Sequence, residues 1–555
     1  MPCATLRPPL PCPALPWLLL ALAVPAAAGP GALPATAPGA GRSPKIVLIA
    51  GPLDSHPRET HEYEKNVLLL RYCLETAPAF RGARVEVHFD GWPTNAATLD
   101  DADTIFLTSG GSDRREADHP LYVGDRLAQL DRQMRRGCGL VLFHWSTFHP
   151  SRVHDQITQW IGGYFDYETG PGPNRWYSAI QTRSWTPVLA APGHPVARGV
   201  RPFSLTEEFY FKLRFRDPDP RLTPILLKEA AANPAADPRP NTVGWTVERA
   251  DGGRAFGFTG GHFYRNWWVP DFRRLLLNAL AWTARIEVPA GGVDAPLGER
   301  LRALVVTGHQ HPGHDWRATT AALLHGIEQD PRALVDVTEK PEDLGLPRLH
   351  DYQLVVLNYC NWERPGLGEA ARTNFTRWLS NGGGAAVIHF ANGAFHASLP
   401  GTPASDWPEY RRVVRRAWDH AGPSGHDPYG PFRVEMTPVP HPITAGLGAF
   451  ETVDELYFRQ AGEESITPLA TARSQVTGRD EPMAWAHDYG RGRVFQTVLG
   501  HSAESVRRAA PLIRRGAVWA ASREPLGFDP PARLLERATF RGGSPWTPAA
   551  PAKRP

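Results

Sequence analysis

Histidines and carboxylates follow short apolar runs in this chain, and the same set occurs twice. His144 comes directly after Leu140–Phe143, and His389 comes directly after Ala385–Ile388. The other repeated groups are Glu207-Glu208 with Asp454-Glu455, and His262 with His501. Imidazole titrates near neutrality and carboxylates can orient it, so these residue types predict acid-base catalysis. The catalytic candidates are therefore His389, His501, Asp454, Glu455, His144, His262, Glu207 and Glu208.

Each of these groups also has a purely structural interpretation. His144 and His389 could be buried imidazoles that donate to loop carbonyls, as buried polar groups usually do. One carboxylate of each acidic pair could pair with an arginine or cap a helix. Catalysis requires instead that the histidines and acids of each copy meet in one solvent-reachable hollow.

The segment after the first apolar run of each copy is rich in metal-ligand side chains. It contains His56 and His61 in the first copy and His309, His314 and Asp315 in the second. A divalent transition metal such as zinc needs three or four such donors converging, so a metal is a candidate cofactor. Neither HExxH nor CxxC spacing occurs, and the alternatives are that His61 opens a helix and that Asp315 is an N-cap.

Aromatic residues near the expected strand ends point to a sugar ligand. An indole face matches the apolar face of a pyranose, while amides and carboxylates bind its hydroxyls. The candidate substrate-binding residues are Trp145, Trp316, Asn392, Trp407, Tyr457 and Trp362. For each tryptophan the alternative is ordinary packing in the core.

The repetition extends over whole domains, because four separate motifs recur at a nearly constant distance along the chain. Within each copy, short β-branched apolar runs alternate with amphipathic segments, which predicts a parallel sheet flanked by helices. The expected strands are 45–50, 85–89, 104–107, 140–143 and 255–258 in the first copy, and 302–306, 334–337, 354–357, 385–388 and 494–498 in the second. Ligands bind beyond the carboxyl ends of such strands, where the repeated polar residues fall.

The divisions of the 555 residues follow from composition. We expect a signal peptide at 1–28, a flexible leader at 29–43, domains at 44–288 and 301–522, a linker at 289–300 and a Pro/Arg-rich tail at 523–555. The apolar run 15–24 is too short to span a bilayer and precedes Ala26-Ala27-Ala28, typical of a cleavage site. This predicts a periplasmic or secreted protein without an integral span in the mature chain, the alternative being an uncleaved anchor.

Charge and cysteine content narrow the function further. The formal net charge of +3, with both signs scattered, argues against a nucleic-acid partner. Only Cys73, Cys138 and Cys360 remain after the signal peptide, which excludes a disulfide scaffold. The sequence does not determine the oligomeric state.

Taken together, the motifs GGG-apolar-His, HP-x-x-x-G, acidic-Glu-x-Tyr and Gly-His resemble those of the ThuA-like, or trehalose-utilisation, family. The resemblance implies two tandem flavodoxin-like, class I glutamine-amidotransferase-like α/β domains and a role in carbohydrate metabolism. Amidotransferases present a Cys nucleophile after the strand that here ends at His144 or His389. Cys138 and Cys360 lie elsewhere, so glutaminase activity is not expected.

We therefore expect an exported carbohydrate-processing protein, acting on a sugar or 3-keto-glycoside as a lyase, hydrolase or isomerase. His389 and His501 would transfer the proton, with His144 and His262 as counterparts in the first copy. The alternative is a non-catalytic carbohydrate-binding or scaffold protein that holds the same ligand without turnover.

Overall fold

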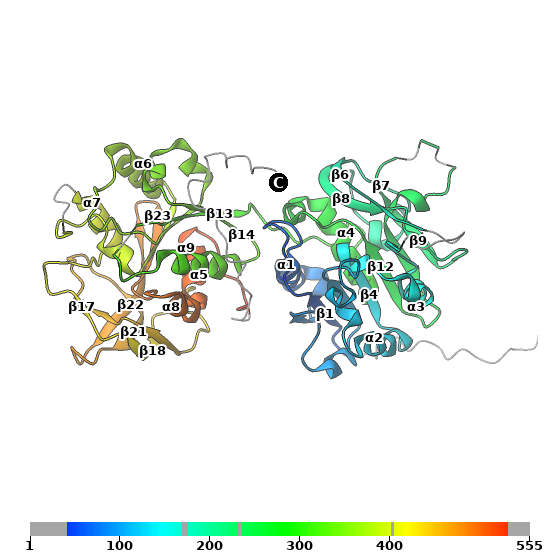
Figure 1. Ribbon diagram of the computed structural model, residues 1–555, viewed down its shortest axis with the longest axis horizontal. Coiled ribbons are helices and arrows are strands. Elements are labelled where there is room, and N and C mark those ends of the chain that lie inside the picture. The colour runs from blue at the N-terminus through cyan, green and yellow to red at the C-terminus, as the bar shows by residue number, and fades with distance from the viewer. Residues whose placement is uncertain are drawn as a thin grey trace, which may run out of the picture.

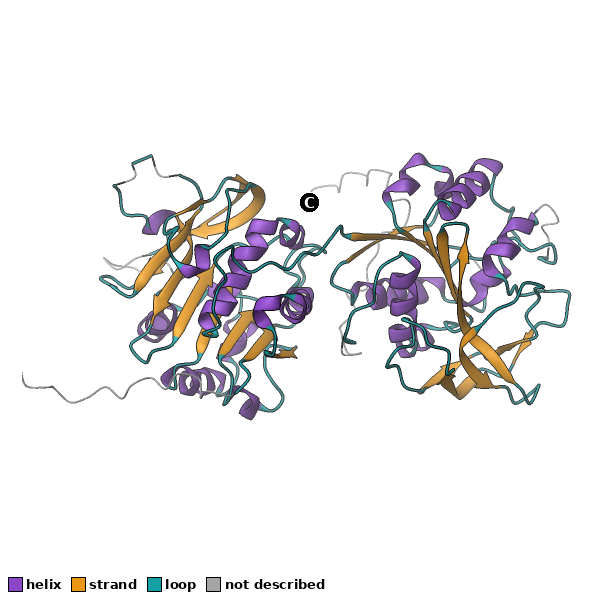
Figure 2. Ribbon diagram, turned by 180° about the vertical axis from the view of Figure 1, so that it is seen from behind, coloured by secondary structure: helices purple, strands orange, loops and turns teal. Residues whose placement is uncertain are grey.

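The computed structural model describes residues 42–168, 176–230, 232–233, 235–309, 311–400 and 405–530. Figure 1 shows two α/β bodies side by side, one built from the first half of the chain and one from the second. Figure 2 shows the same arrangement from behind, with a strand-rich sheet and flanking helices in each body. The expected signal peptide, nearly all of the leader and the tail beyond 530 lie outside the described residues.

The first half contains an eight-stranded sheet in the order β2-β1-β3-β4-β12-β11-β10-β7. The strands β2, β1, β3, β4 and β12 are parallel neighbours, and β11, β10 and β7 continue the sheet antiparallel. In that order the bounds are Arg84–His88, Lys45–Ala50, Thr104–Thr108, Gly139–Phe143, Arg254–Phe258, Thr242–Glu248, Leu222–Leu227 and Val188–Leu189. Two small antiparallel pairs lie outside this sheet. They are β5 (Gly163–Tyr164) with β9 (Arg214–Phe215), and β6 (Ala179–Trp185) with β8 (Leu205–Phe211).

The second half repeats this plan in a nine-stranded sheet, β14-β13-β15-β16-β23-β22-β21-β18-β19. Its first five strands are parallel and the rest antiparallel. The bounds are Ala333–Thr338, Leu301–Val306, Leu354–Leu357, Gly384–Ile388, Gly492–Thr497, Asp480–Tyr489, Pro468–Arg473, Gly430–Met436 and Phe450–Asp454. A short pair, β17 (Gly425–His426) with β20 (Tyr457–Phe458), lies apart from this sheet.

The helices flank these sheets in both halves (Figure 2). Those of the first half are α1 (Tyr63–Thr76), α2 (Arg126–Arg135), α3 (His154–Ile161) and α4 (Pro270–Thr283). Those of the second half are α5 (Trp316–Glu328), α6 (Glu369–Ser380), α7 (Pro408–Val414), α8 (Ala503–Arg508) and α9 (Ala510–Ala520). Within the described residues, no helix is both long and apolar enough to cross a membrane.

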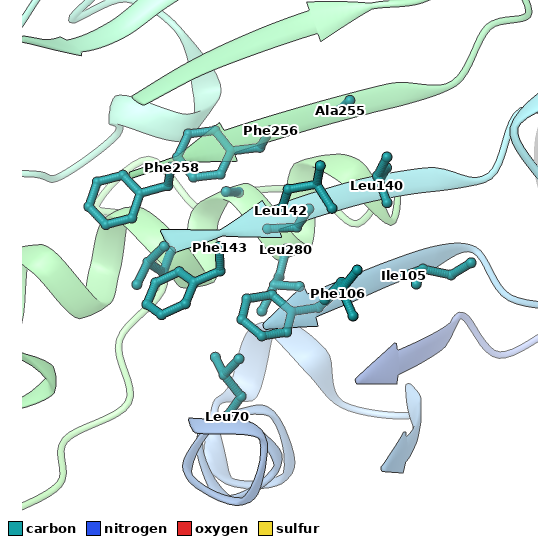
Figure 3. Packing of buried hydrophobic residues seen from close by; sticks show 14 of the residues in the cluster. Leu70, Ile105, Phe106, Leu140, Leu142, Phe143, Ala255, Phe256, Phe258 and Leu280 are labelled. Atoms are coloured by element: carbon teal, nitrogen blue, oxygen red, sulfur yellow. The ribbon is translucent and has the colours of Figure 1, made fainter. Parts of the chain in front are cut away.

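The hydrophobic core explains why the apolar runs form the central strands. Figure 3 shows Phe106, Phe143 and Phe258 together on neighbouring strands, with Leu70 of α1 and Leu280 of α4 close to them. The rings of Phe143 and Phe258 lie 6.0 Å apart between centroids, and all five side chains are buried. A strand covered by helices on both faces reads as a continuous apolar run, and this is the pattern present in the sequence.

The predicted fold class is confirmed: each half has a mainly parallel core in the flavodoxin-like order. The ten predicted strands all occur, and their ends agree with the prediction to within two residues. The sequence did not predict the antiparallel extension of each sheet, because its strands, such as β11 and β22, carry mixed polar and apolar residues.

The segments outside the two domains pack against them. Val293, Ala295 and Leu297 of the expected linker are buried in the core of the first half. After α9, Leu526 and Phe528 pack on Leu68 of α1, so the first residues of the expected tail return to the first half. The two halves therefore share a contact surface that involves α1.

Candidate functional site

A histidine stands at the sharp turn after the fourth parallel strand of each half. His144 has a φ of 57° and His389 has a φ of 46°, the left-handed region that costs an L-residue about 1–2 kcal/mol. Both are buried. Such a strained backbone conformation persists only where the surrounding structure holds it. Here the conformation directs each imidazole into the space beyond the ends of the strands.

A glycine-histidine turn after the fifth parallel strand faces this histidine in each half. Gly261 and Gly500 have φ values of 117° and 126°, which only glycine adopts readily. The buried carboxylate of Glu207 accepts hydrogen bonds from the backbone N–H groups of Gly261 at 2.9 Å and His262 at 3.0 Å. Asp454 does the same in the second half, with Gly500 at 2.8 Å and His501 at 3.1 Å.

These bonds give Glu207 and Asp454 a positioning role. Neither carboxylate is exposed to solvent, and both are occupied by backbone amides. Burial raises the pKa of Glu207 to about 7 and that of Asp454 to about 6. The N–H donors lower both pKa values, but burial has the larger effect. The acids that face the histidines are their neighbours, Glu208 and Glu455.

Four side chains converge in the first half: His61, His144, Glu208 and His262. One ligand atom from each lies within 4.8 Å of the others. His61 Nε2 is 2.9 Å from His262 Nδ1, which is 3.5 Å from Glu208 Oε1. The side chains of His262 and Glu208 are 14% and 22% exposed, so the cluster is open to solvent on that side.

The second half repeats the arrangement with His314, His389, Glu455 and His501, again within 4.8 Å. His314 Nε2 lies 3.2 Å from His389 Nε2, and Glu455 Oε2 lies 3.2 Å from His501 Nδ1 and 3.7 Å from His389 Nε2. We call each group of three histidines and one glutamate a histidine centre. Two copies of one constellation make accidental convergence a poor explanation.

Hydrogen bonds at the outer ring nitrogens aim lone pairs into each centre. His144 Nδ1 is 2.7 Å from the Thr259 carbonyl, which can only accept, so this nitrogen carries the proton. His389 is fixed in the same way by Val498, at 2.7 Å. Their Nε2 atoms therefore carry the lone pairs, and the hydroxyls of Tyr210 and Tyr457 lie 2.8 and 2.9 Å from them. Each nitrogen has one lone pair, so an ion bound there would displace the hydroxyl as its partner.

In the first half a further relay orients His61. The Tyr63 hydroxyl donates to Asp54 at 2.7 Å, so its oxygen accepts from His61 Nδ1 at 2.9 Å. His61 Nε2 is thus also a lone-pair donor directed into the centre. Metal-binding histidines usually have this kind of outer partner, which fixes the tautomer.

The donor geometry of both centres fits a divalent transition metal. Ligand nitrogens about 2.0–2.1 Å from a tetrahedral zinc ion lie roughly 3.3 Å apart. Five of the donor separations, at 2.9, 3.2, 3.2, 3.5 and 3.7 Å, surround this value, and all donors of each centre lie within 4.8 Å of one another. Three neutral imidazoles and one carboxylate are ligand types that zinc and similar ions accept.

Electrostatics keep most of these imidazoles neutral. Burial lowers the pKa of His144 and of His389 well below the ordinary range, and neighbouring imidazoles add to the effect. Burial also lowers the pKa of His314 to about 3. Burial lowers the pKa of His501 too, but hydrogen bonding and the charge of Glu455 outweigh it, so that the net shift is upward.

A further histidine lies beside each centre, with its Nδ1 held by a hydrogen bond. His56 Nδ1 is 2.8 Å from Asp54 Oδ1, its ring stacks on His61 at 3.8 Å, and its Nε2 is 3.4 Å from Arg114 Nη2. In the second half His426 Nδ1 donates to the Asp427 carbonyl at 2.8 Å, and His426 Nε2 is 3.7 Å from Glu455. We call His56 and His426 the flanking histidines.

Aromatic rings border both centres. The Trp145 ring lies 5.1 Å from that of His56, and its Nε1–H donates to Asp113 at 2.8 Å. In the second half Trp362 lies 4.7 Å from His311, and Trp418 lies 4.6 Å from Tyr457. Of the predicted substrate-binding residues, Trp145, Trp362 and Tyr457 therefore lie near the chemistry.

Other predicted site residues lie away from the centres. Trp407 is buried against Phe375, Phe395 and Tyr410, and the fully buried Asn392 donates to Gln460 at 2.7 Å, so both stabilise the core. Trp316 begins α5 under the guanidinium of Arg317, 4.0 Å from its ring.

The predicted metal ligands divide in the same way. His61 and His314 enter the centres, and His56 flanks the first. His309 instead bonds the Trp362 carbonyl at 2.7 Å, and Asp315 caps α5 by accepting from the N–H groups of Arg317 and Ala318. The N-cap interpretation of Asp315 is therefore correct, because its carboxylate is committed to backbone amides.

The sequence analysis treated the metal candidates and the catalytic candidates as two separate sets. The structure combines one member of the first set with three of the second in each half. It also adds Tyr210, Asp54, Tyr63 and His426, which the sequence analysis did not select. One signal was available: in acidic-Glu-x-Tyr, residues two apart in a strand share a face, which places Glu208 and Tyr210 together.

Comparisons with known proteins agree with the two-domain fold. The trehalose-utilisation family, ThuA, matches residues 70–283 and 302–520, well over half of the chain. A ThuA-like protein from Parabacteroides merdae is 27% identical with a TM-score of 0.35, over 41% of this chain and 92% of that one. A second from Bacteroides uniformis is 16% identical with a TM-score of 0.34, over 42% and 95%. No curated protein matches the chain.

Proposed function

The chain belongs to the ThuA trehalose-utilisation family, and from this premise we propose that it is a metal-dependent enzyme acting on a sugar or a 3-keto-glycoside. The observation that carries the proposal is the duplicated histidine centre, whose donors lie within 4.8 Å in both halves. His61, His144, Glu208 and His262 would hold one divalent ion, and His314, His389, Glu455 and His501 a second. An ion bound there would polarise a sugar carbonyl by accepting its oxygen as a fifth ligand, an expansion that catalytic zinc undergoes.

The proton transfer is assigned to the flanking histidines, because the histidines of the centre are needed as ligands. His426 Nδ1 is tied to a carbonyl, so its Nε2 lone pair is the available base beside the second centre. His56, oriented by Asp54, has the corresponding place in the first half, where Arg114 must leave Nε2 before this nitrogen accepts a proton. The base takes the proton from the carbon next to the sugar carbonyl, leaving the electron pair as an enediolate.

The rest of each site would bind and orient the sugar. Tyr210 and Tyr457 present hydroxyls at the inner edge of the centres, 2.8 and 2.9 Å from His144 and His389. The half-buried indole of Trp418 would provide a face for the apolar side of a pyranose, whereas Trp145 is buried with the Arg114 guanidinium 4.7 Å from its ring. Return of the proton to the opposite face would make the reaction an isomerisation, and loss of a group from the next carbon would make it a lyase reaction.

Two measurements on the full chain test this proposal. Zinc content after dialysis should be two ions per chain, and one in His144→Ala or His389→Ala. Turnover of a 3-keto-glycoside, followed by mass spectrometry, should be lost in His56→Gln/His426→Gln with both ions retained. His350→Gln is the matched control, because His350 is exposed in the second half.

The outcomes separate this proposal from its alternative. A chain that holds no metal, or that turns over the ketone at the same rate without both flanking histidines, would contradict it. Sugar binding by calorimetry with no product would favour the non-catalytic carbohydrate-binding or scaffold protein.

We also propose export by way of the signal peptide at 1–28. The apolar run and the small residues after it support this proposal. N-terminal sequencing of the protein released from an expressing cell should begin near residue 29, and a chain retained with an intact N-terminus would contradict export.

A further inference from the structure

The loop between β1 and α1, residues 51–62, carries His56 and His61 and also contacts the second half. Arg58 donates to the carboxylate of Glu328 at the end of α5 and, at 2.9 Å, to the carbonyl of Val335 in β14. Glu328 in turn accepts from the Val335 backbone N–H at 2.9 Å. The Arg58 and Glu328 side chains are 29% and 12% exposed, so water screens this pair only in part.

The neighbouring residues of the first half are attached to the same surface. Glu59 binds the guanidinium of Arg300, which directly precedes β13, with one contact at 2.6 Å. The buried Tyr264 hydroxyl donates to the Pro331 carbonyl at 2.6 Å, and the Lys65 ammonium reaches the Ala333 carbonyl at 3.2 Å. Figure 1 shows α1 facing the β13–β14 edge between the two bodies.

These contacts bear directly on two members of the first histidine centre. The His61 backbone N–H donates to the His262 carbonyl at 3.1 Å, and Thr60 forms an antiparallel bridge with Phe263. Tyr264 N–H donates to the Glu59 carbonyl at 2.9 Å. The loop and the glycine-histidine turn are therefore one paired segment, held from outside through Arg58, Glu59 and Tyr264.

In the corresponding loop of the second half, the described residues have no such attachment. In its described residues, 307–309 and 311–315, the hydrogen bonds run to partners within the second half, such as Trp362 and His389. The dependence is therefore one-sided, although the two centres have the same ligands.

We propose that the second half of the chain positions the histidine centre of the first half, with Arg58, Glu59 and Tyr264 as the positioning residues. This inference rests on the proposed metal centres. A metal site tolerates errors of only about 0.5 Å in its ligands, so release of the loop separates His61 from His262 and weakens binding. By linkage, metal bound in the first half tightens the contact between the halves.

The test uses full chains that retain a single centre. His389→Ala leaves the first centre and His144→Ala leaves the second. Arg58→Ala is introduced into each, and zinc affinity is measured by competition with a chromophoric chelator. We expect affinity to fall about 10–100-fold in the His389→Ala chain, the loss typical of an outer-shell change, and to stay unchanged in the His144→Ala chain.

Two further variants exclude a general folding defect. Glu328→Gln, in the other half, should reproduce the loss and add little to Arg58→Ala, because both remove one interaction. Arg58→Lys should restore part of the affinity. The matched control is Arg183→Ala, which removes an exposed ion pair with Glu229 on the first half.

The outcomes are distinguishable from failure of the proposed function. A His389→Ala chain that binds no zinc would overturn the first metal centre and this inference together. A His389→Ala chain that binds one zinc ion with the same affinity whether or not Arg58 is present would overturn this inference alone. Equal losses at both centres would also overturn it, since the structure attaches only the first.

Discussion

Replacing Glu207 by glutamine disrupts the hydrogen bonds that hold the glycine-histidine turn, while the shape of the side chain is preserved. Each oxygen of Glu207 accepts two N–H groups: Oε1 from His262 and Glu208, and Oε2 from Gly261 and Asn266. In Glu207→Gln one of these oxygens becomes an NH2 group that faces two donors. At least two buried N–H groups then lose their acceptor.

The size of the effect follows from this count. A buried donor left without an acceptor costs about 1–3 kcal/mol, so the loss should be about 2–6 kcal/mol. Domains are stable by only about 5–15 kcal/mol, which makes this a large fraction. With a urea slope of about 3 kcal/mol per M, the unfolding midpoint of the first half should fall by roughly 0.7–2 M.

The assay is urea unfolding of the full chain, followed by tryptophan fluorescence at pH 8. Because burial raises the pKa of Glu207 to about 7, the wild-type group is mainly ionised at that pH. Asp454→Asn should shift the transition of the second half instead. Glu248→Gln, an exposed glutamate on β11, is the control and should stay within about 0.5 kcal/mol.

The zinc affinity of the first centre should fall together with the folding stability of the first half, because the hydrogen bonds of Glu207 position His262. A midpoint shift below about 0.3 M in Glu207→Gln, equivalent to roughly 1 kcal/mol, would refute the reasoning. So would a shift of equal size in Glu248→Gln.

Two further predictions concern the strands and the thiols. Gly139→Ala would place its Cβ 2.4 Å from the Thr283 carbonyl oxygen, and Gly384→Ala would place its Cβ 2.2 Å from the Ala520 carbonyl oxygen. Each variant should lose about 1–3 kcal/mol of folding stability and melt several degrees lower. Gly448→Ala, where the Cβ meets open space, should melt as the wild type. Cys73, Cys138 and Cys360 are buried free thiols, and burial raises the pKa of Cys73 and of Cys138 to about 12. We therefore expect iodoacetamide to leave all three unmodified until urea unfolds the chain, as peptide mapping would show. Labelling of the native protein would contradict their burial.

Local sequence patterns were sufficient for the parallel core of each half. The run before His144 and its repeat before His389 are continuous and apolar because these strands are buried on both faces, and a helix covers each face. Such a run can be recognised without knowing its partners. The antiparallel extension was missed, because its strands mix polar and apolar residues: β11 reads TVGWTVE and β22 reads DEPMAWAHDY.

The candidate site could be predicted only in part. The turn histidines, the glycine-histidine motif and the acidic pairs were identifiable because each repeats with its local context. Which acid faces the histidines was not, since Glu207 and Glu208 are adjacent in one strand and point to opposite faces. The hydrogen bonds of Glu207 to the turn show that Glu207 holds the turn and that Glu208 faces the histidines.

The sequence by itself determined a duplicated α/β protein with histidines at equivalent strand ends, because repetition and periodicity are properties of neighbouring residues. Only the tertiary structure joined His61 to His144 and His314 to His389, and attached Arg58 to Glu328. These residues are far apart along the chain, and their proximity depends on how strands and loops pack. Packing of that kind is set by the whole fold and leaves no periodic pattern in the sequence.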